Sequence, residues 1–168
     1  MRADLFWIPG PWRGRLAIAA RPRGGDWLDD EASAWRRAGI NVVVSLLEDE
    51  EAAQLDLVDE RQAAEGRAIG FVSFPIPDRG VPASTEAAIE VIARIAAQLE
   101  AGKNVAVHCR QGVGRSGLIA TGVLMNSGLQ AEEAMDAVSS ARGIAVPETV
   151  EQRRWIEQLA SSVPARLL

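Results

Sequence analysis

Among its 168 residues, the sequence has one cysteine, one histidine and no tyrosine. A single cysteine cannot close an intramolecular disulfide, so a reducing compartment is the simpler expectation. One histidine and one cysteine cannot build the multi-cysteine or cysteine–histidine sites that are typical of zinc. We therefore predict no metal and no cofactor, although a site made of carboxylates alone stays open.

Long apolar runs are also missing. No stretch approaches the roughly 20 apolar residues that a membrane-spanning helix needs, and the first ten residues lack the apolar centre of a secretory signal. The formal net charge of −5 and the pI of about 5.0 argue against nucleic acid as a partner. We expect a cytoplasmic protein with no membrane span, and a single domain over residues 1–168. The oligomeric state cannot be predicted.

Apolar, β-branched runs alternate with helix-forming runs along the chain. We expect strands at residues 5–8, 15–20, 41–47, 69–76 and 104–108. We expect helices at residues 26–38, 48–65, 84–101, 116–126, 131–141 and 147–160. This alternation predicts an α/β fold: a central, mainly parallel sheet with helices on both faces, a three-layer sandwich. In such folds ligands bind beyond the carboxyl ends of the strands, where loops 77–80 and 108–115 would meet.

Three local patterns need an interpretation. Gly117 and Gly122 are expected to let the helix at 116–126 pack closely on the sheet. The acidic residues 48–51 are interpreted as the solvated first turn of a helix rather than as a metal site. Arg21 and Arg23 are interpreted as part of a solvated turn, with the alternative that they face an anionic substrate.

The chemistry-bearing residues gather in one stretch, from His108 to Gly117. The stretch follows a short apolar run and precedes a helix-forming run, which predicts a strand, a glycine-bearing loop and a helix. Glycine allows such a loop to turn its N–H groups inward around a tetrahedral anion. Arg115 falls in the first helical turn, where its guanidinium fork can hold two phosphate oxygens and the helix N-terminus adds partial positive charge.

The same surroundings act on Cys109. A helix N-terminus and nearby cations favour the thiolate, which is the nucleophilic form of cysteine. Ser116 can donate its hydroxyl to the sulfur, and His108 is interpreted as a buried, hydrogen-bonded organiser of the loop. The alternative for Cys109 is a buried, inert small hydrophobe. Its place between His108 and Arg115 favours the nucleophile.

A thiolate that attacks a phosphate monoester expels an oxygen that needs a proton. Asp78 is the candidate acid, since it lies on a proline-bounded loop upstream of Cys109. It would protonate the leaving oxygen and then, as the carboxylate, activate a water molecule. The alternative is an aspartate that only helps to form a turn before Gly80.

At these residues the chain resembles the cysteine-dependent protein-tyrosine phosphatase superfamily, and most of all its compact dual-specificity and atypical branch. The His108-Cys109 pair, Arg115 and Ser116-Gly117 match the family's phosphate loop, and Pro77-Asp78 matches its general-acid loop. The resemblance implies Cys109 as nucleophile, Arg115 as transition-state clamp, Asp78 as acid and base, and Ser116 as thiolate partner. It also implies that the phosphate is bound by the N–H groups of Arg110, Gln111, Gly112, Val113, Gly114 and Arg115.

The resemblance leaves several points open. Gln152 resembles a glutamine that some relatives place near the hydrolytic water, with a solvent-facing helix residue as the alternative. The acid loop lacks the tryptophan and the chain lacks the tyrosine of tyrosine-specific members, which implies a shallower cleft open to phosphoserine, phosphothreonine and phosphotyrosine. We therefore predict a phosphorylated protein or peptide as substrate. A phosphoinositide or another small phosphate ester is the alternative substrate, and a non-catalytic phosphate-binding module is the alternative function.

Overall fold

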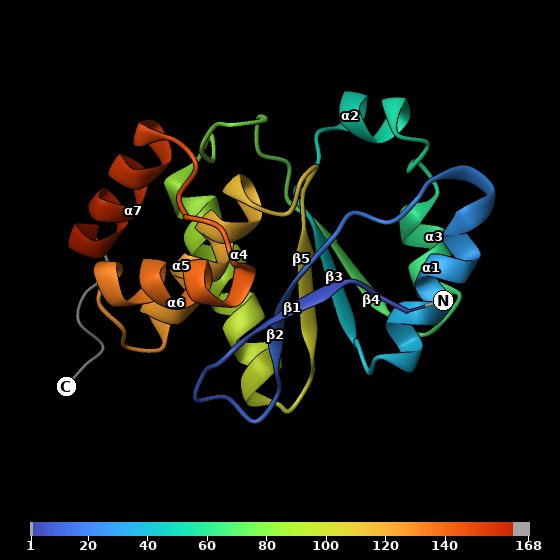
Figure 1. Ribbon diagram of the computed structural model, residues 1–168, viewed down its shortest axis with the longest axis horizontal. Coiled ribbons are helices and arrows are strands. Elements are labelled where there is room, and N and C mark those ends of the chain that lie inside the picture. The colour runs from blue at the N-terminus through green and yellow to red at the C-terminus, as the bar shows by residue number, and fades with distance from the viewer. Residues whose placement is uncertain (1, 163–168) are drawn as a thin grey trace.

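The computed structural model describes residues 2–162, and a five-stranded sheet forms its centre (Figure 1). The strands are β1 (Leu5–Ile8), β2 (Leu16–Ala19), β3 (Val42–Ser45), β4 (Gly70–Ser73) and β5 (Val105–His108), in the spatial order β1-β2-β5-β3-β4. Only β1 runs antiparallel to its neighbour; the other strand pairs are parallel. The predicted mainly parallel sheet is confirmed.

Helices cover both faces of this sheet (Figure 1). They are α1 (Leu28–Arg37), α2 (Asp49–Gln54), α3 (Glu60–Glu65), α4 (Thr85–Glu100), α5 (Gly114–Asn126), α6 (Ala131–Arg142) and α7 (Val150–Ser162), with a short 3-10 turn, η1 (Gly25–Trp27), before α1. Helices α1 and α3 lie on one face, and α4, α5 and α6 lie on the other. The predicted three-layer arrangement is confirmed.

The central strands are buried on both faces because their residues alternate between two hydrophobic clusters. In β3, Val42 and Val44 belong to the cluster under α4 and α5, whereas Val43 belongs to the cluster under α1 and α3. In β5, Val107 belongs to the cluster under α4 and α5, and Ala106 belongs to the cluster under α1 and α3. Alternate side chains of a strand point to opposite faces, so an unbroken apolar run is what two covered faces require.

The glycines of α5 pack against neighbours other than the sheet, which corrects the expectation. A Cβ on Gly122 would lie 2.5 Å from a methyl carbon of Ile92 in α4. A Cβ on Gly117 would lie 2.6 Å from a methyl carbon of Val146. The two glycines therefore allow α4 and the segment before α7 to approach α5.

Three predicted boundaries were wrong. The helix predicted over 48–65 is two helices, because Asp56 takes a φ of 58° between them and Leu57 turns into a small cluster with Leu28 and Leu47. Strand β4 stops at Ser73, not at residue 76. The last helix begins at Val150 and not near Pro147.

Candidate active site

The loop between β5 and α5 has the predicted strand–loop–helix form. Gly112 takes a φ of +70°, the conformation that glycine allows most readily, and α5 begins two residues later at Gly114. The amide N–H groups of residues 110–115 donate no hydrogen bond to any other described residue. Cys109 lies at the start of this loop and is 2% exposed. The loop thus combines free N–H donors, a helix N-terminus and a buried sulfur, which is a suitable binding site for a tetrahedral anion.

The side chain of Arg115 is buried and held from three directions. Its Nη1 donates to Glu51 Oε1 at 2.6 Å and to the carbonyl oxygen of Ile76 at 2.8 Å. Its Nη2 donates to Glu51 Oε2 at 2.9 Å and to Asp78 Oδ1 at 3.1 Å. Burial lowers the pKa of Arg115, but the hydrogen bonds to Glu51 and the charges of Cys109, Glu51 and Asp78 outweigh it, so the pKa lies above its ordinary value.

Glu51 is the residue at this site that the sequence interpretation missed. The acidic run was expected to be solvated, yet the Glu51 side chain is only 11% exposed and holds both terminal nitrogens of Arg115. Burial raises its pKa, but the hydrogen bonds from Arg115 and the Glu48 amide and the charges of Arg115 and Arg110 lower it below the usual value. Glu51 therefore acts as the carboxylate that fixes the guanidinium.

Asp78 lies beside Arg115, as its predicted role requires. Its side chain is 55% exposed, so it faces solvent at one end and Arg115 at the other. The loop that carries it is a tight turn, since Gly80 donates to the carbonyl of Pro77 at 2.8 Å. Arg79 pairs with Glu148 at 2.9 Å, which ties the loop to the segment before α7. The structure thus brings together Cys109's loop, Arg115 and Asp78.

His108 lies behind the loop in a fully buried position. Its Nε2 is 2.5 Å from Glu60 Oε2, and its ring stacks on Trp35 with centroids 6.3 Å apart. Its Nδ1 lies 3.3 Å from the carbonyl oxygen of Cys109. Glu60, from α3, is a second acidic residue that the sequence did not single out. These contacts suit a residue that orients the loop.

Ser116 does not make the predicted contact. Its hydroxyl is buried and has no hydrogen-bond partner among the described residues, so the expected donation to the Cys109 sulfur is not present. Helix α5 directs the Ser116 side chain from the turn after the loop, and rotation about one side-chain bond sets where its hydroxyl points. The predicted role of the Ser116 hydroxyl as a donor to the Cys109 sulfur therefore stays a prediction.

Gln152 is buried rather than solvent-facing, and both ends of its amide are used. Its side-chain Oε1 accepts hydrogen bonds from the backbone N–H groups of Glu148 and Thr149. In return, Thr149 Oγ1 accepts from the backbone N–H of Gln152 at 3.1 Å. This is a capping box, and the Thr-x-x-Gln spacing is its sequence signal. Gln152 Nε2 donates to the carbonyl of Gly80 at 3.1 Å. Gln152 therefore joins the start of α7 to the acid loop.

Arginines from the loop after β2 lie next to the phosphate loop. Arg21 Nη1 donates to the carbonyl oxygen of Arg110 at 2.6 Å. Arg21, Arg23 and Arg110 line a shared cavity of about 480 Å³. Arg23 also pairs with Glu31 at 2.6 Å. Arg21 therefore contacts the backbone of the phosphate loop, and the alternative that Arg21 and Arg23 face an anionic substrate stays a prediction.

Comparison with known proteins shows which family this fold belongs to. Residues 18–129 match the family model described as polymorphic toxin system, DSP-PTPase phosphatase. The chain belongs to this family, which confirms the resemblance inferred from the phosphate loop.

Individual relatives support the same assignment. Cyclin-dependent kinase inhibitor 3 of Rattus norvegicus is 27% identical over 95 residues, which cover 55% of this chain and 44% of the relative. The chain thus spans about half the length of the curated relatives that it matches. The crystal structure of Tk-PTP in the active form is 32% identical, with a TM-score of 0.78 and coverage of 95% of this chain and 98% of that one. The kinase associated phosphatase shares the fold at 17% identity, with a TM-score of 0.85 and 99% of each chain covered.

Residues 2–162 contain neither a metal-binding cluster nor a membrane-spanning helix. Within that range no group of histidine, cysteine or acidic side chains is placed to hold a metal ion. No helix in the same range is long and apolar enough to span a membrane.

Proposed function

We propose that the protein hydrolyses phosphate monoesters on phosphoproteins, with phosphotyrosine and phosphoserine or phosphothreonine as substrates, through a phosphocysteine on Cys109. The observation that carries this proposal is the 3.1 Å contact between Arg115 and Asp78 beside the loop of Cys109. One side chain that can clamp a phosphate and one that can move a proton lie together at the nucleophile's loop. This pair is what separates a hydrolase from a loop that only binds phosphate.

In the first step the Cys109 sulfur attacks phosphorus as the thiolate. An S–P bond forms and the P–O ester bond breaks, while protonated Asp78 gives its proton to the leaving oxygen. The loop N–H groups and the Arg115 guanidinium stabilise the charge that builds on the phosphoryl oxygens. The alcohol or phenol then leaves.

In the second step water attacks the phosphocysteine. The Asp78 carboxylate takes a proton from the water, the S–P bond breaks, and inorganic phosphate and the thiolate are released. His108 acts as a positioning residue because its contact with the Cys109 carbonyl holds the start of the loop. Ser116 would donate to the thiolate after rotation of its hydroxyl, and Gln152 would position the acid loop rather than the water.

The test is hydrolysis of para-nitrophenyl phosphate in the presence of EDTA. Cys109→Ser should abolish turnover while the variant still binds tungstate and keeps its melting temperature. Asp78→Asn should lower kcat by about 10²–10⁴-fold with little change in KM, and Asp59→Asn, an exposed aspartate elsewhere, serves as the control. Full activity of Cys109→Ser would refute the nucleophile, and unchanged turnover of Asp78→Asn would refute the acid.

A second candidate substrate is a phosphoinositide or another small phosphate ester. The cavity that Arg21, Arg23 and Arg110 line beside the loop favours it, since guanidinium groups bind additional phosphates well. A panel of phosphotyrosyl, phosphothreonyl and phosphoinositide substrates separates the two. Higher kcat/KM on the phosphoinositides would reverse our order of preference.

We also propose that residues 1–168 act as one domain in the cytoplasm without binding nucleic acid. The lone cysteine at the site suits a reducing compartment, and the net charge of −5 disfavours a polyanion such as RNA. Cell fractionation tests the location. A gel-shift assay that gives a stable complex with RNA or DNA would contradict the second part.

A further inference from the structure

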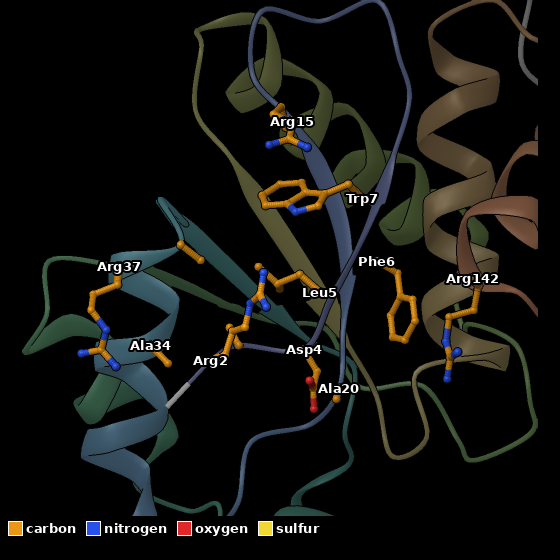
Figure 2. Close-up of a pocket in the computed structure, with 12 residues that line it drawn as sticks. Arg2, Asp4, Leu5, Phe6, Trp7, Arg15, Ala20, Ala34, Arg37 and Arg142 are labelled. Atoms are coloured by element: carbon orange, nitrogen blue, oxygen red, sulfur yellow. The ribbon is translucent and has the colours of Figure 1, made fainter.

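A second cavity lies away from the phosphate loop, between the edge strand β1 and helix α1 (Figure 2). Its volume is about 870 Å³, which falls within the range of about 300–1,000 Å³ that small-molecule pockets occupy. None of its lining residues belongs to the stretch 108–117. The cavity is therefore distinct from the site described above.

Arginine dominates the charge of this cavity. Four of its lining residues are arginines, namely Arg2, Arg15, Arg37 and Arg142, and Asp4 is the only acidic residue among them. The chain as a whole is acidic, with a net charge of −5, so this concentration of positive charge runs against the composition. Figure 2 shows that the arginines come from different segments, with Arg37 on α1 and Arg2 and Arg15 beside the strands. Arg2 and Arg37 lie on the side of β1 that faces α1, together with Leu5, whereas Arg142 lies beside Phe6 on the other side of this strand (Figure 2).

Two of the arginines are held in position by aromatic rings. The Arg15 guanidinium lies 3.9 Å from the centroid of Trp7, and Arg142 lies 4.1 Å from that of Phe6. Arg142 also donates from Nε to the carbonyl of Gly112 at 2.7 Å and from Nη2 to the carbonyl of Gln111 at 3.5 Å, so it is tied to the phosphate loop rather than directed at a ligand in the cavity.

The remaining surface of the cavity is apolar and aromatic. Leu5, Trp7, Ala34 and Ala38 line it, and Leu5 and Trp7 are only partly buried. In Figure 2, Arg15 covers the face of the Trp7 ring that points away from Leu5 and Arg2. An indole between a guanidinium and an apolar floor is a suitable surface for a planar ring, which offset stacking favours.

We propose that this cavity binds a phosphorylated small molecule that carries an aromatic ring, of the class of a nucleoside diphosphate. Its phosphates would pair with Arg2 and Arg37, and its ring would lie on the apolar floor beside Trp7 (Figure 2). The cavity volume of about 870 Å³ and the aromatic floor at Trp7 favour this ligand over an extended acidic peptide. The site is independent of the proposed phosphatase activity.

Isothermal titration calorimetry with ADP tests the proposal. Excess tungstate is added to occupy the phosphate loop, so that the measured binding is to another site. ADP should bind under these conditions, and Arg37→Gln should weaken binding about tenfold or more, the usual effect of losing a charged hydrogen bond. Arg36→Gln is the matched control, since Arg36 is the exposed neighbour of Arg37 on α1 and does not line the cavity; it should leave the affinity unchanged.

Tripolyphosphate and hexaglutamate complete the design. ADP should bind more tightly than tripolyphosphate if the ring is recognised, and more tightly than hexaglutamate if the site is built for a small molecule. Absence of ADP binding in the presence of tungstate, or equal weakening by Arg36→Gln and Arg37→Gln, overturns the proposal. Equal or tighter binding of tripolyphosphate or hexaglutamate overturns the assigned ligand class. Each outcome is read from binding alone, so it stays interpretable even if the protein hydrolyses no phosphate ester.

Discussion

Replacing Glu51 with alanine should impair both stability and activity, although Glu51 lies outside the phosphate loop. In the folded protein its two carboxylate oxygens hold the two terminal nitrogens of Arg115 at 2.6 and 2.9 Å. The pair is buried, with side-chain exposures of 1% for Arg115 and 11% for Glu51. Alanine would leave a buried guanidinium that keeps only the carbonyls of Leu46 and Ile76 and the carboxylate of Asp78.

The expected size of the effect follows from this burial. Removing one partner of a buried ion pair costs about 3–5 kcal/mol, because the other charge stays buried without compensation. A domain of this length loses about 2–4 °C in melting temperature for each kcal/mol, so Tm should fall by about 6–20 °C. A guanidinium displaced by about 1 Å should also lower kcat/KM by about 10²-fold.

Differential scanning calorimetry and para-nitrophenyl phosphate kinetics measure these two effects. Glu50→Ala is the matched control, because Glu50 is the exposed neighbour in the same helix, and it should leave both quantities unchanged. Glu51→Gln keeps the shape and one acceptor, and should recover part of the stability. Wild-type Tm and kcat/KM in Glu51→Ala would refute the inference that Glu51 fixes Arg115.

Three further predictions concern the same region. The pKa of Glu51 is lowered from its ordinary value of 4.5, so the stability that Glu51 adds is present above about pH 4.5 and is lost as the pH falls through the lowered pKa. The difference in unfolding free energy between wild type and Glu51→Gln, measured by urea unfolding, should therefore shrink in acid. A difference that grows in acid would contradict the lowered pKa. Gln152→Leu frees the carbonyl of Gly80 and should lower kcat by up to about 10²-fold; unchanged kinetics would show that the acid loop needs no such tie. Glu60→Leu leaves the Nε2 of His108 without a partner and should cost about 1–3 kcal/mol in urea unfolding, with recovery in Glu60→Gln; equal losses in both variants would indicate packing rather than the hydrogen bond.

Much of the fold follows from local patterns in the sequence. The unbroken apolar runs at β3 and β5 predict strands that are buried on both faces, and the structure divides their residues between two clusters. A serine or threonine before an amphipathic run is the usual signal for a helix cap, which fits Ser84 or Thr85, and Ser84 caps α4 by accepting from the Ala87 amide at 3.1 Å. Gly143 ends α6 with a φ of 78°. In each case the residue acts on its immediate neighbours along the chain.

The residues that the sequence did not reveal act over long separations. Glu51 and Glu60 look like ordinary solvated acids in their own helices, because nothing near them in the sequence shows that a buried arginine or histidine lies opposite. Their partners, Arg115 and His108, are 64 and 48 residues away. The break between α2 and α3 has a similar cause, since Leu57 turns into a cluster with Leu28 of α1 and with Leu47, which follows β3. Such features depend on tertiary packing, which overrides local helix preference.

The sheet register explains why Arg115 can collect partners from such distant segments. Ser45 of β3 pairs with His108 of β5 and with Ser73 of β4, so these three parallel strands end at the same level. The segments that follow them therefore leave the sheet at one edge. From the segment after β3 Arg115 takes Glu51 and the carbonyl of Leu46, and from the segment after β4 it takes Asp78 and the carbonyl of Ile76.

A single guanidinium thus fixes the phosphate loop, the segment that carries Glu51 and the acid loop relative to one another. Loss of Arg115 would therefore remove more than the proposed phosphate ligand, because Asp78 would lose the contact that holds it beside the loop of Cys109. Arg115→Lys tests this directly: lysine keeps the charge but cannot reproduce the fork that reaches Glu51 and Asp78 together. We expect Arg115→Lys to lose turnover on an aryl phosphate that still binds, and a variant with weaker binding but normal kcat would show that Arg115 serves the substrate alone.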